Sequence, residues 1–240
     1  LTSLVTQSSP YFKLVLIRHA ESLGNTQKIM EGQGSTALSV RGQRQAQRLA
    51  DVLVPSQLSL SALPSSALPT CLYSSPLLRA SQTATVLHQA WRQLGHAVPV
   101  HHSNQLQEIH PGIFQGLTWI QATQQYPELC DRLMTSLAWQ PVPQAESPTE
   151  ARDRAHSWLT QILNRHRPDD TVWAVSHAGL MVQMVSAIMG CDRTWQVPIR
   201  HTAIFEFQLA HTHWQSLTED RFNPEYWILK RFNDSQHIKG

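Results

Sequence analysis

Short apolar runs alternate with helical patterns along most of this chain, and this alternation limits the folds it can adopt. The run KLVLIR at residues 13–18 is continuous and rich in Val, Leu and Ile, which is typical of a strand buried on both faces. Further strands are expected at residues 70–75, 98–103 and 171–176. Helices are expected at residues 39–53, 75–95, 148–167 and 177–190. The order of these elements predicts an α/β fold around a mostly parallel sheet.

The helix expected at 75–95 has end signals that can be checked. Ser75 is its expected N-cap, Pro76 falls in the first turn, and Gly95 stands at the end. A strand at 202–210 is expected to form a late hairpin with a second strand at 213–219.

Residues 105–150 depart from the regular alternation. Amphipathic helical segments fall within residues 117–140, and PVPQAESP at 141–148 breaks the pattern before the next helix. We expect this stretch to form a helical cap over the carboxyl edge of the sheet, where ligands bind in open α/β folds. No repeat or domain-scale linker appears, so residues 1–240 are expected to form a single domain.

Composition excludes several classes of function. The net charge of +2 is too small to indicate nucleic-acid binding, and no apolar run approaches the roughly 18–20 residues of a membrane span. Three widely spaced cysteines argue against a disulfide framework and favour a reducing cytoplasm. The first twelve residues lack the features of a secretory signal. The sequence leaves open whether the protein is a homodimer.

Two of the expected strands end in a histidine. LVLIRHA runs into Arg18 and His19, and VWAVSHAG runs into Ser176 and His177, where a helix also begins. Helix N-termini carry unpaired N–H groups and a partial positive charge, so they attract anions. If the two strands are neighbours, the imidazoles, Arg18 and the helix start would converge and form an anion site.

Two further residues fit the same chemistry. Arg79 lies in the first turn of a helix, where the helix dipole disfavours a cation unless an anion compensates. An arginine also suits phosphate oxygens because its guanidinium is a planar fork of donors. Glu108 follows the third strand between Leu106 and Ile109, and a carboxyl in partly apolar surroundings can serve as a proton donor.

Together these residues predict phosphoryl transfer through a histidine. A neutral imidazole, His19, would attack phosphorus while Arg18, Arg79 and His177 spread the charge of the transferring group. Glu108 would protonate the leaving alkoxide, and water would then hydrolyse the phosphohistidine. Each residue alone is more often structural; the prediction depends on the whole set lying at strand ends. Neither a metal nor a cofactor is required.

A metal-dependent hydrolase is the alternative from a different class. Three histidine-containing pairs could share one face of a strand and bind a metal. These pairs are His101 with His102, Glu108 with His110, and His211 with His213. Exposed or packing histidines are the simpler interpretation. The candidates for an apolar cap wall are Ile113, Phe114, Leu117, Trp119, Leu133, Met134, Leu137 and Trp139. Packing of the cap helices against the sheet would explain more than half of them.

The motifs resemble those of the histidine phosphatase superfamily, the phosphoglycerate mutase-like enzymes. LIRHAES followed by Asn25 is similar to that family's R-H-G-[EQ]-[ST]-x-x-N signature, with Ala20 where Gly is common. LSVRGQRQAQRLA, YSSPLLRASQTA, LQEIHPGIFQGLT and VSHAG resemble its later segments in the same order, covering about residues 13–180. The resemblance implies a three-layer α/β/α sandwich.

The resemblance also implies a role for each matching residue. His19 would be the phosphorylated nucleophile and Glu108 the proton donor. Arg18, Arg79 and His177 would hold phosphate, with Asn25 as a secondary contact. Two positions depart from the family's pattern: Phe114-Gln115-Gly116 replaces the usual Trp-Glu-Gly, and Ser35 or its neighbours replace a common Asp.

The family contains both phosphatases and mutases. The stretch between Glu108 and AESP is short and resembles the broad-specificity phosphatases, whereas the mutases carry a long insertion there. The ending RFNDSQHI also looks like the phosphatase tail. The resemblance favours a metal-independent phosphomonoesterase of the histidine acid phosphatase type, with a cofactor-dependent phosphoglycerate mutase as the alternative. Phosphorylated sugars, phosphorylated carboxylic acids and a ribazole phosphate are all plausible substrates.

Overall fold

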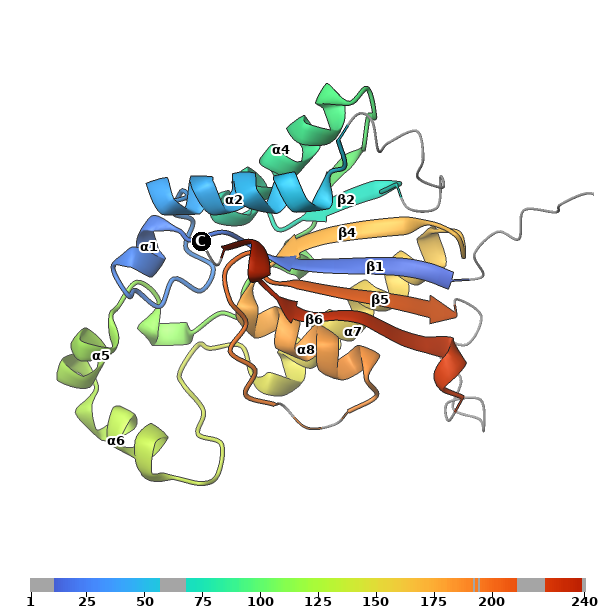
Figure 1. Cartoon of the computed structure of the whole chain (residues 1–240). Coiled ribbons are helices and arrows are strands. Elements are labelled where there is room, and N and C mark those ends of the chain that lie inside the picture. The colour runs from blue at the N-terminus through green and yellow to red at the C-terminus, as the bar shows by residue number, and fades with distance from the viewer. Residues whose placement is uncertain (1–10, 57–67, 192, 194, 211–222, 239–240) are drawn as a thin grey trace, which may run out of the picture.

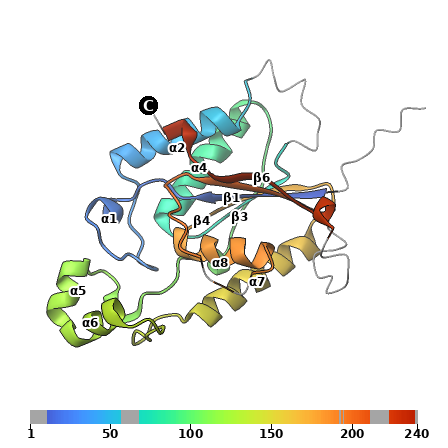
Figure 2. The ribbon, with the colours of Figure 1, turned by 60° about the horizontal axis from the view of Figure 1, so that its bottom comes forward.

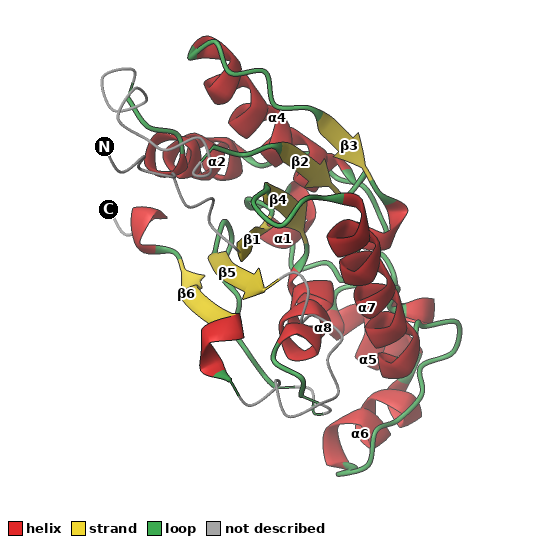
Figure 3. Ribbon diagram, turned by 90° about the vertical axis from the view of Figure 1, so that its right-hand side faces the viewer, coloured by secondary structure: helices red, strands yellow, loops and turns green. Residues whose placement is uncertain are grey.

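A mixed sheet of six strands, in the order β3-β2-β4-β1-β5-β6, forms the centre of the protein (Figure 3). The computed structural model describes residues 11–56, 68–191, 193, 195–210 and 223–238. The strands are β1 (Tyr11–Arg18), β2 (Cys71–Ser74), β3 (Val100–His102), β4 (Thr171–Ser176), β5 (Ile204–Ala210) and β6 (Trp227–Asp234). The first four pair in parallel, and β5 and β6 are antiparallel to their neighbours. The predicted, mostly parallel sheet is therefore confirmed.

Two layers of helices cover the sheet, as Figures 1 and 2 show. One face carries α2 (Val40–Leu53) and α4 (Leu78–Gln93), and the other carries α7 (Pro148–Arg165) and α8 (Ala178–Ile188). Side chains of β1 alternate between the two cores: Leu14 and Leu16 pack with α7 and α8, whereas Val15 and Ile17 pack with α2 and α4. This alternation explains the continuous apolar run and confirms the three-layer sandwich. No helix in the described part of the chain is both long and apolar enough to cross a membrane.

The cap lies beyond the carboxyl ends of the parallel strands (Figure 1). Its helices are α5 (Trp119–Gln125) and α6 (Pro127–Thr135), and the change of direction between them falls at Pro127. The cap has a small apolar core of its own, built around Phe114, Leu129 and Cys130. The expectation that cap residues pack against the sheet is therefore wrong for this cluster.

The apolar cap-wall candidates divide into two groups. Ile113, Phe114, Leu117 and Leu133 belong to the cap's own core. The more exposed candidates are Trp119, Met134, Leu137 and Trp139. Exposure leaves the second group available to a ligand or to solvent.

One sequence-based expectation differs from the structure. Ser75 is not the N-cap of α4, because that helix begins at Leu78 and Leu77 takes the cap position. Besides β1, β5 pairs with β6, a strand that the sequence analysis did not predict. The strand expected at 213–219 lies outside the described residues. A short helix, α1 (Leu23–Thr26), follows the strand end that carries His19.

The start of α2 packs tightly against the loop that follows His19. Ser39 caps α2 by accepting from the Gly42 amide, and its own amide donates to the carbonyl of Glu21 at 2.9 Å. A Cβ at Gly42 would overlap that same carbonyl oxygen. The close approach therefore requires glycine, although glycine is a poor helix former.

We predict that Gly42→Ala destabilises the protein. In an exposed helix this change stabilises by about 1 kcal/mol, but here the overlap with backbone should cost about 1–3 kcal/mol. Val40→Ala in the same turn, at a side chain that is 66% exposed, should change stability by less than about 0.5 kcal/mol. Urea unfolding of the three proteins measures both effects; a Gly42→Ala variant as stable as the parent would contradict the close approach.

Candidate active site

Parallel pairing of β1 and β4 brings the two strand-end histidines together. Arg18 lies opposite Ser176 in the register, so the next residues, His19 and His177, emerge side by side. Their ring centroids are 4.9 Å apart, and the side chains are almost fully buried. The arrangement confirms that the two strands are neighbours, as the anion-site prediction requires.

The ring of His19 is held in one tautomer. Its Nδ1 lies 2.7 Å from the carbonyl oxygen of Ala20, and since a carbonyl can only accept, Nδ1 carries the hydrogen. Burial lowers the pKa of His19 well below its usual value, and the nearby His177 and Arg18 lower it further. The ring is therefore neutral at neutral pH, with a lone pair on Nε2.

His177 is the N-cap residue of α8, and its Nε2 lies 2.8 Å from the hydroxyl of Ser75. Burial lowers the pKa of His177 well below its usual value, and the positive charges of Arg79 and Arg18 lower it further. Within the described residues, His177 Nδ1 and Arg18 Nε are buried without a hydrogen-bond partner. Buried polar atoms of this kind are expected where a ligand supplies the partner.

Arg79 lies close to the start of α4 and is only 2% exposed. Its guanidinium donates to the carbonyl oxygens of Gly34 and Gly32 at 2.6 and 2.7 Å. It also lies 3.6 Å from a carboxylate oxygen of Glu31. Sequence analysis expected a bound anion to compensate this cation, but a carboxylate of the protein already does so in part.

Glu31 is a buried residue that contacts several side chains of the site, and the sequence analysis did not identify it. Besides Arg79, its carboxylate accepts from the hydroxyls of Ser22 and Thr36 and from the side-chain amide of Asn25. The signal available in the sequence is a lone acid beside Gly32 in a polar loop. The role of Glu31 can be recognised only when Arg79 is known to contact that loop.

Asn25 is oriented by contacts on both sides of its amide. It forms a capping box with Ser22 at the start of α1, in which Asn25 Oδ1 accepts from the Ser22 amide at 3.1 Å. Its Nδ2 donates to Glu31 at 3.2 Å, and its Oδ1 lies 3.0 Å from Nε2 of His201.

His201 is a third histidine at this site, and the sequence analysis did not single it out. Its ring centroid is 5.8 Å from that of His19. Burial, with Arg18 and Arg41, lowers the pKa of His201 to about 3, so the ring is neutral at physiological pH. His201 precedes β5, which runs antiparallel to β1, so the start of β5 lies at the edge where β1 ends.

Glu108 lies at the N-terminus of α8. Its carboxylate oxygens accept from the backbone amides of Gly179 and Leu180, each at 3.1 Å, and from that of Ile109 at 2.9 Å. A Cβ at Gly179 would come within 2.6 Å of the carboxylate, so the absence of a side chain at Gly179 makes space for Glu108. Backbone donors therefore surround this carboxylate in addition to the expected apolar neighbour, Ile109.

The two departures from the family's pattern have local roles. Ser35 Oγ accepts from the amide of Leu78 at 2.9 Å and so satisfies a free N–H at the start of α4. Gln115 Oε1 accepts from the amide of Gln33 at 3.2 Å, which ties the cap to the loop behind Arg79. Phe114 lies in the cap core.

The candidate metal-ligand pairs that lie within the described residues do not assemble into a larger cluster. Among the described residues, no three His, Cys, Asp or Glu side chains are placed to hold a metal ion together. His101 and His102 are exposed on the edge strand β3, and His110 Nδ1 accepts from the amide of Gly112. His211 and His213 lie outside the described residues.

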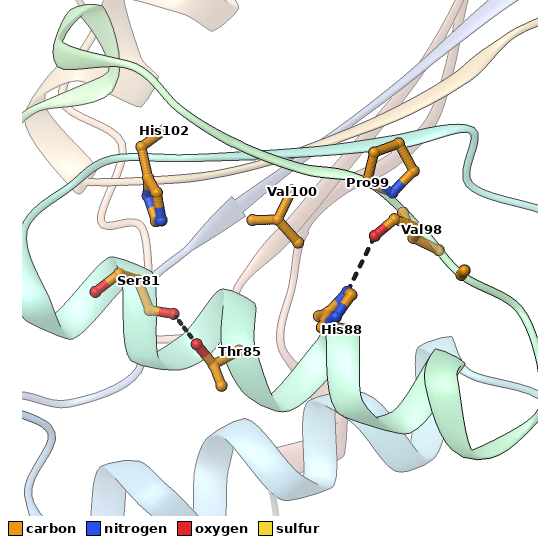
Figure 4. Close-up of a pocket in the computed structure, with 8 residues that line it drawn as sticks. Ser81, Thr85, His88, Val98, Pro99, Val100 and His102 are labelled. Atoms are coloured by element: carbon orange, nitrogen blue, oxygen red, sulfur yellow. Dashed lines mark hydrogen bonds between the residues drawn. The ribbon is translucent and has the colours of Figure 1, made fainter.

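Of two cavities in the structure, one adjoins the predicted site and the other lies away from it. One of about 490 Å³ adjoins the acid: it is lined by Ile109, which follows Glu108, and by Gln183, one helical turn beyond Gly179. Trp139 also lines it. A groove of about 630 Å³ between α4 and β3 contains His88 and His102 but none of the predicted catalytic or phosphate-binding residues (Figure 4).

Curated relatives of this chain include phosphatases. The chain is 30% identical over 180 residues to phosphoserine phosphatase 1 of Hydrogenobacter thermophilus, covering 75% of this chain and 77% of the relative. It is 28% identical over 184 residues to glucosyl-3-phosphoglycerate phosphatase of Mycolicibacterium vanbaalenii, covering 74% of each.

Solved structures share the fold. YhfR of Bacillus stearothermophilus aligns with a TM-score of 0.72 at 22% identity, covering 95% of this chain and all of that one. Alpha-ribazole phosphatase of Shigella flexneri aligns with a TM-score of 0.69 at 20% identity, covering 93% and 97%. A sequence model of one family matches residues 14–220. With the two histidines, the arginines and the acid gathered at one sheet edge, the chain belongs to branch 1 of the histidine phosphatase superfamily.

Proposed function

We propose that this protein hydrolyses small phosphate monoesters through a phosphohistidine formed on His19. The observation that carries the proposal is the state of the His19 ring, which is neutral and presents the lone pair of Nε2 beside His177. The positive charges of Arg18 and Arg79 also lower the pKa of this ring. A neutral nucleophile within a cationic pocket suits attack on an anionic phosphoryl group.

In the first half-reaction, His19 Nε2 forms a bond to phosphorus and the bond from phosphorus to the ester oxygen breaks. Arg18, Arg79 and His177 stabilise the charge on the transferring oxygens, and Asn25 adds a neutral donor. Glu108 enters this step in its protonated form and gives that proton to the leaving oxygen, so the alcohol departs uncharged.

In the second half-reaction, a water molecule attacks the phosphorus of phosphohistidine. Glu108, now a carboxylate, accepts a proton from that water, the bond from phosphorus to Nε2 breaks, and inorganic phosphate leaves. His19 returns to its neutral form with the hydrogen still on Nδ1.

The cavity beside Glu108 is the proposed site of the alcohol part of the substrate. Its volume of about 490 Å³ suits a small sugar or a carboxylic acid. The relatives named for phosphoserine and for glucosyl-3-phosphoglycerate support this size class. The short segment between Glu108 and α7 supports hydrolysis over mutase activity, because it leaves little chain with which to exclude water.

We also propose a cytoplasmic location. Cys71 and Cys130 are free thiols, and both are buried. Free buried thiols are typical of proteins in a reducing compartment.

We predict that His19→Ala abolishes hydrolysis of p-nitrophenyl phosphate. Loss of the nucleophile should lower kcat/KM by about a thousandfold or more. Assays run in excess EDTA should give the wild-type rate without added metal, since the described groups supply the positive charge themselves. His102→Ala, at an exposed position on β3, is the matched control and should keep the wild-type rate. Full activity in His19→Ala would refute the mechanism.

We predict that Glu108→Gln affects substrates according to their leaving group. Nitrophenolate departs readily without a proton, so its ester should lose less than about tenfold in kcat/KM, whereas an alkyl phosphate should lose about 10²–10⁴-fold. Steady-state kinetics on the two esters gives the comparison. An equal loss on both would show that Glu108 does not act as the acid.

A further inference from the structure

The contact between His201 and Asn25 joins segments 176 residues apart in the sequence. Asn25 Oδ1 can only accept, so His201 Nε2 carries the hydrogen and donates it across 3.0 Å. The assignment of the amide is consistent, because Asn25 Nδ2 faces the carboxylate of Glu31 and Oδ1 faces two N–H donors.

These contacts leave one N–H group of the Asn25 side chain for a ligand. Its Oδ1 is occupied by the Ser22 amide and by His201, and one N–H of Nδ2 is directed to Glu31. Within the part of the chain that the structure describes, no hydrogen bond engages the second N–H of this amide, which leaves it for a phosphoryl oxygen. Without the donor on His201, the amide oxygen would keep only the Ser22 amide as a partner, and the side chain would be held less firmly in the orientation that presents this N–H.

The backbone after His201 is tied to the strand end that carries the nucleophile. Thr202 is buried and has a φ of 57°, an uncommon conformation for a β-branched residue. Its amide donates to the carbonyl oxygens of Arg18 and His19 at 3.1 and 3.3 Å. The position of His201 is therefore set by the same residues that hold the phosphoryl group.

We propose that His201 is a positioning residue for the phosphate site, which fixes the side-chain amide of Asn25 so that it donates to the phosphoryl group. This inference rests on the proposed function, because it takes Asn25 as a phosphate contact. His201 acts through Asn25 and takes no part in proton transfer.

Packing of the His201 ring against His19 is the competing role, and two substitutions separate it from hydrogen bonding. His201→Gln keeps an N–H donor of similar reach but loses the ring. His201→Phe keeps an aromatic ring but loses the donor. If the hydrogen bond matters, Gln should recover most of what Phe loses; if ring packing matters, the order should reverse.

The first readout is the inhibition constant of inorganic phosphate, measured with p-nitrophenyl phosphate as substrate. His201→Phe should raise this constant by about 3–10-fold, the effect of one hydrogen bond, and should raise KM more than it lowers kcat. His201→Gln should lie within about twofold of the parent. His88→Phe, which removes a histidine hydrogen bond to the backbone carbonyl of Val98 outside the site, is the control and should have no effect.

The second readout repeats the comparison in an Asn25→Ala background. If His201 acts through Asn25, His201→Phe should have no further effect there, within about twofold. A loss of the same size in both backgrounds, or equal losses for Gln and Phe, would overturn the proposal. If His201→Phe does not fold, His201→Ala removes the donor without adding volume and takes its place in both comparisons.

Failure of this inference differs from failure of the proposed function. If the chain is not a phosphatase, the parent protein itself will not hydrolyse p-nitrophenyl phosphate, and His19→Ala will make no difference. If only the role of His201 is wrong, the parent remains active and sensitive to His19→Ala, while the two backgrounds show equal losses.

Discussion

The in-register pairing of β1 with β4 is the constraint on which the site depends. Arg18 opposite Ser176 makes His19 and His177 neighbours, and the start of α8 directly after His177 adds the backbone amides that hold Glu108. A shift of one residue in that register would turn one of the histidines to the other face of the sheet. The antiparallel strand β5 approaches the same edge from the opposite direction and contributes His201.

Charge balance explains how so many cations can be buried together. Arg79 and Glu31 are 2% and 5% exposed at their side chains, and burying such a pair is unfavourable unless its remaining polar atoms are satisfied. Loop carbonyls satisfy the guanidinium, and two hydroxyls and an amide satisfy the carboxylate. The same carboxylate thus holds Arg79 and Asn25 in place, which links the loop between α1 and α2 to the proposed phosphate site.

The sequence predicted the elements whose signals are local. The apolar runs identified β1 to β4, and the helices expected at residues 39–53 and 177–190 correspond to α2 and α8. The cap of α4 was assigned wrongly because Ser75 bonds to His177, a partner 102 residues away. Glu31 and His201 were missed for a similar reason. The role of Glu31 depends on Arg79, which is buried against the same loop, and the role of His201 depends on the direction of β5. Neither can be predicted from the neighbouring residues in the sequence.

The proposed mechanism requires a covalent intermediate on His19, and trapping that intermediate tests the mechanism most directly. The protein is mixed with a phosphate monoester, quenched in alkaline denaturant to preserve phosphohistidine, digested with trypsin and examined by mass spectrometry. The tryptic peptide of residues 19–28 contains His19 as its only histidine. The account predicts one added phosphoryl group on this peptide, absent from His19→Ala. A phosphoryl group found instead on His177 or His201, or turnover with none on any histidine, would contradict it.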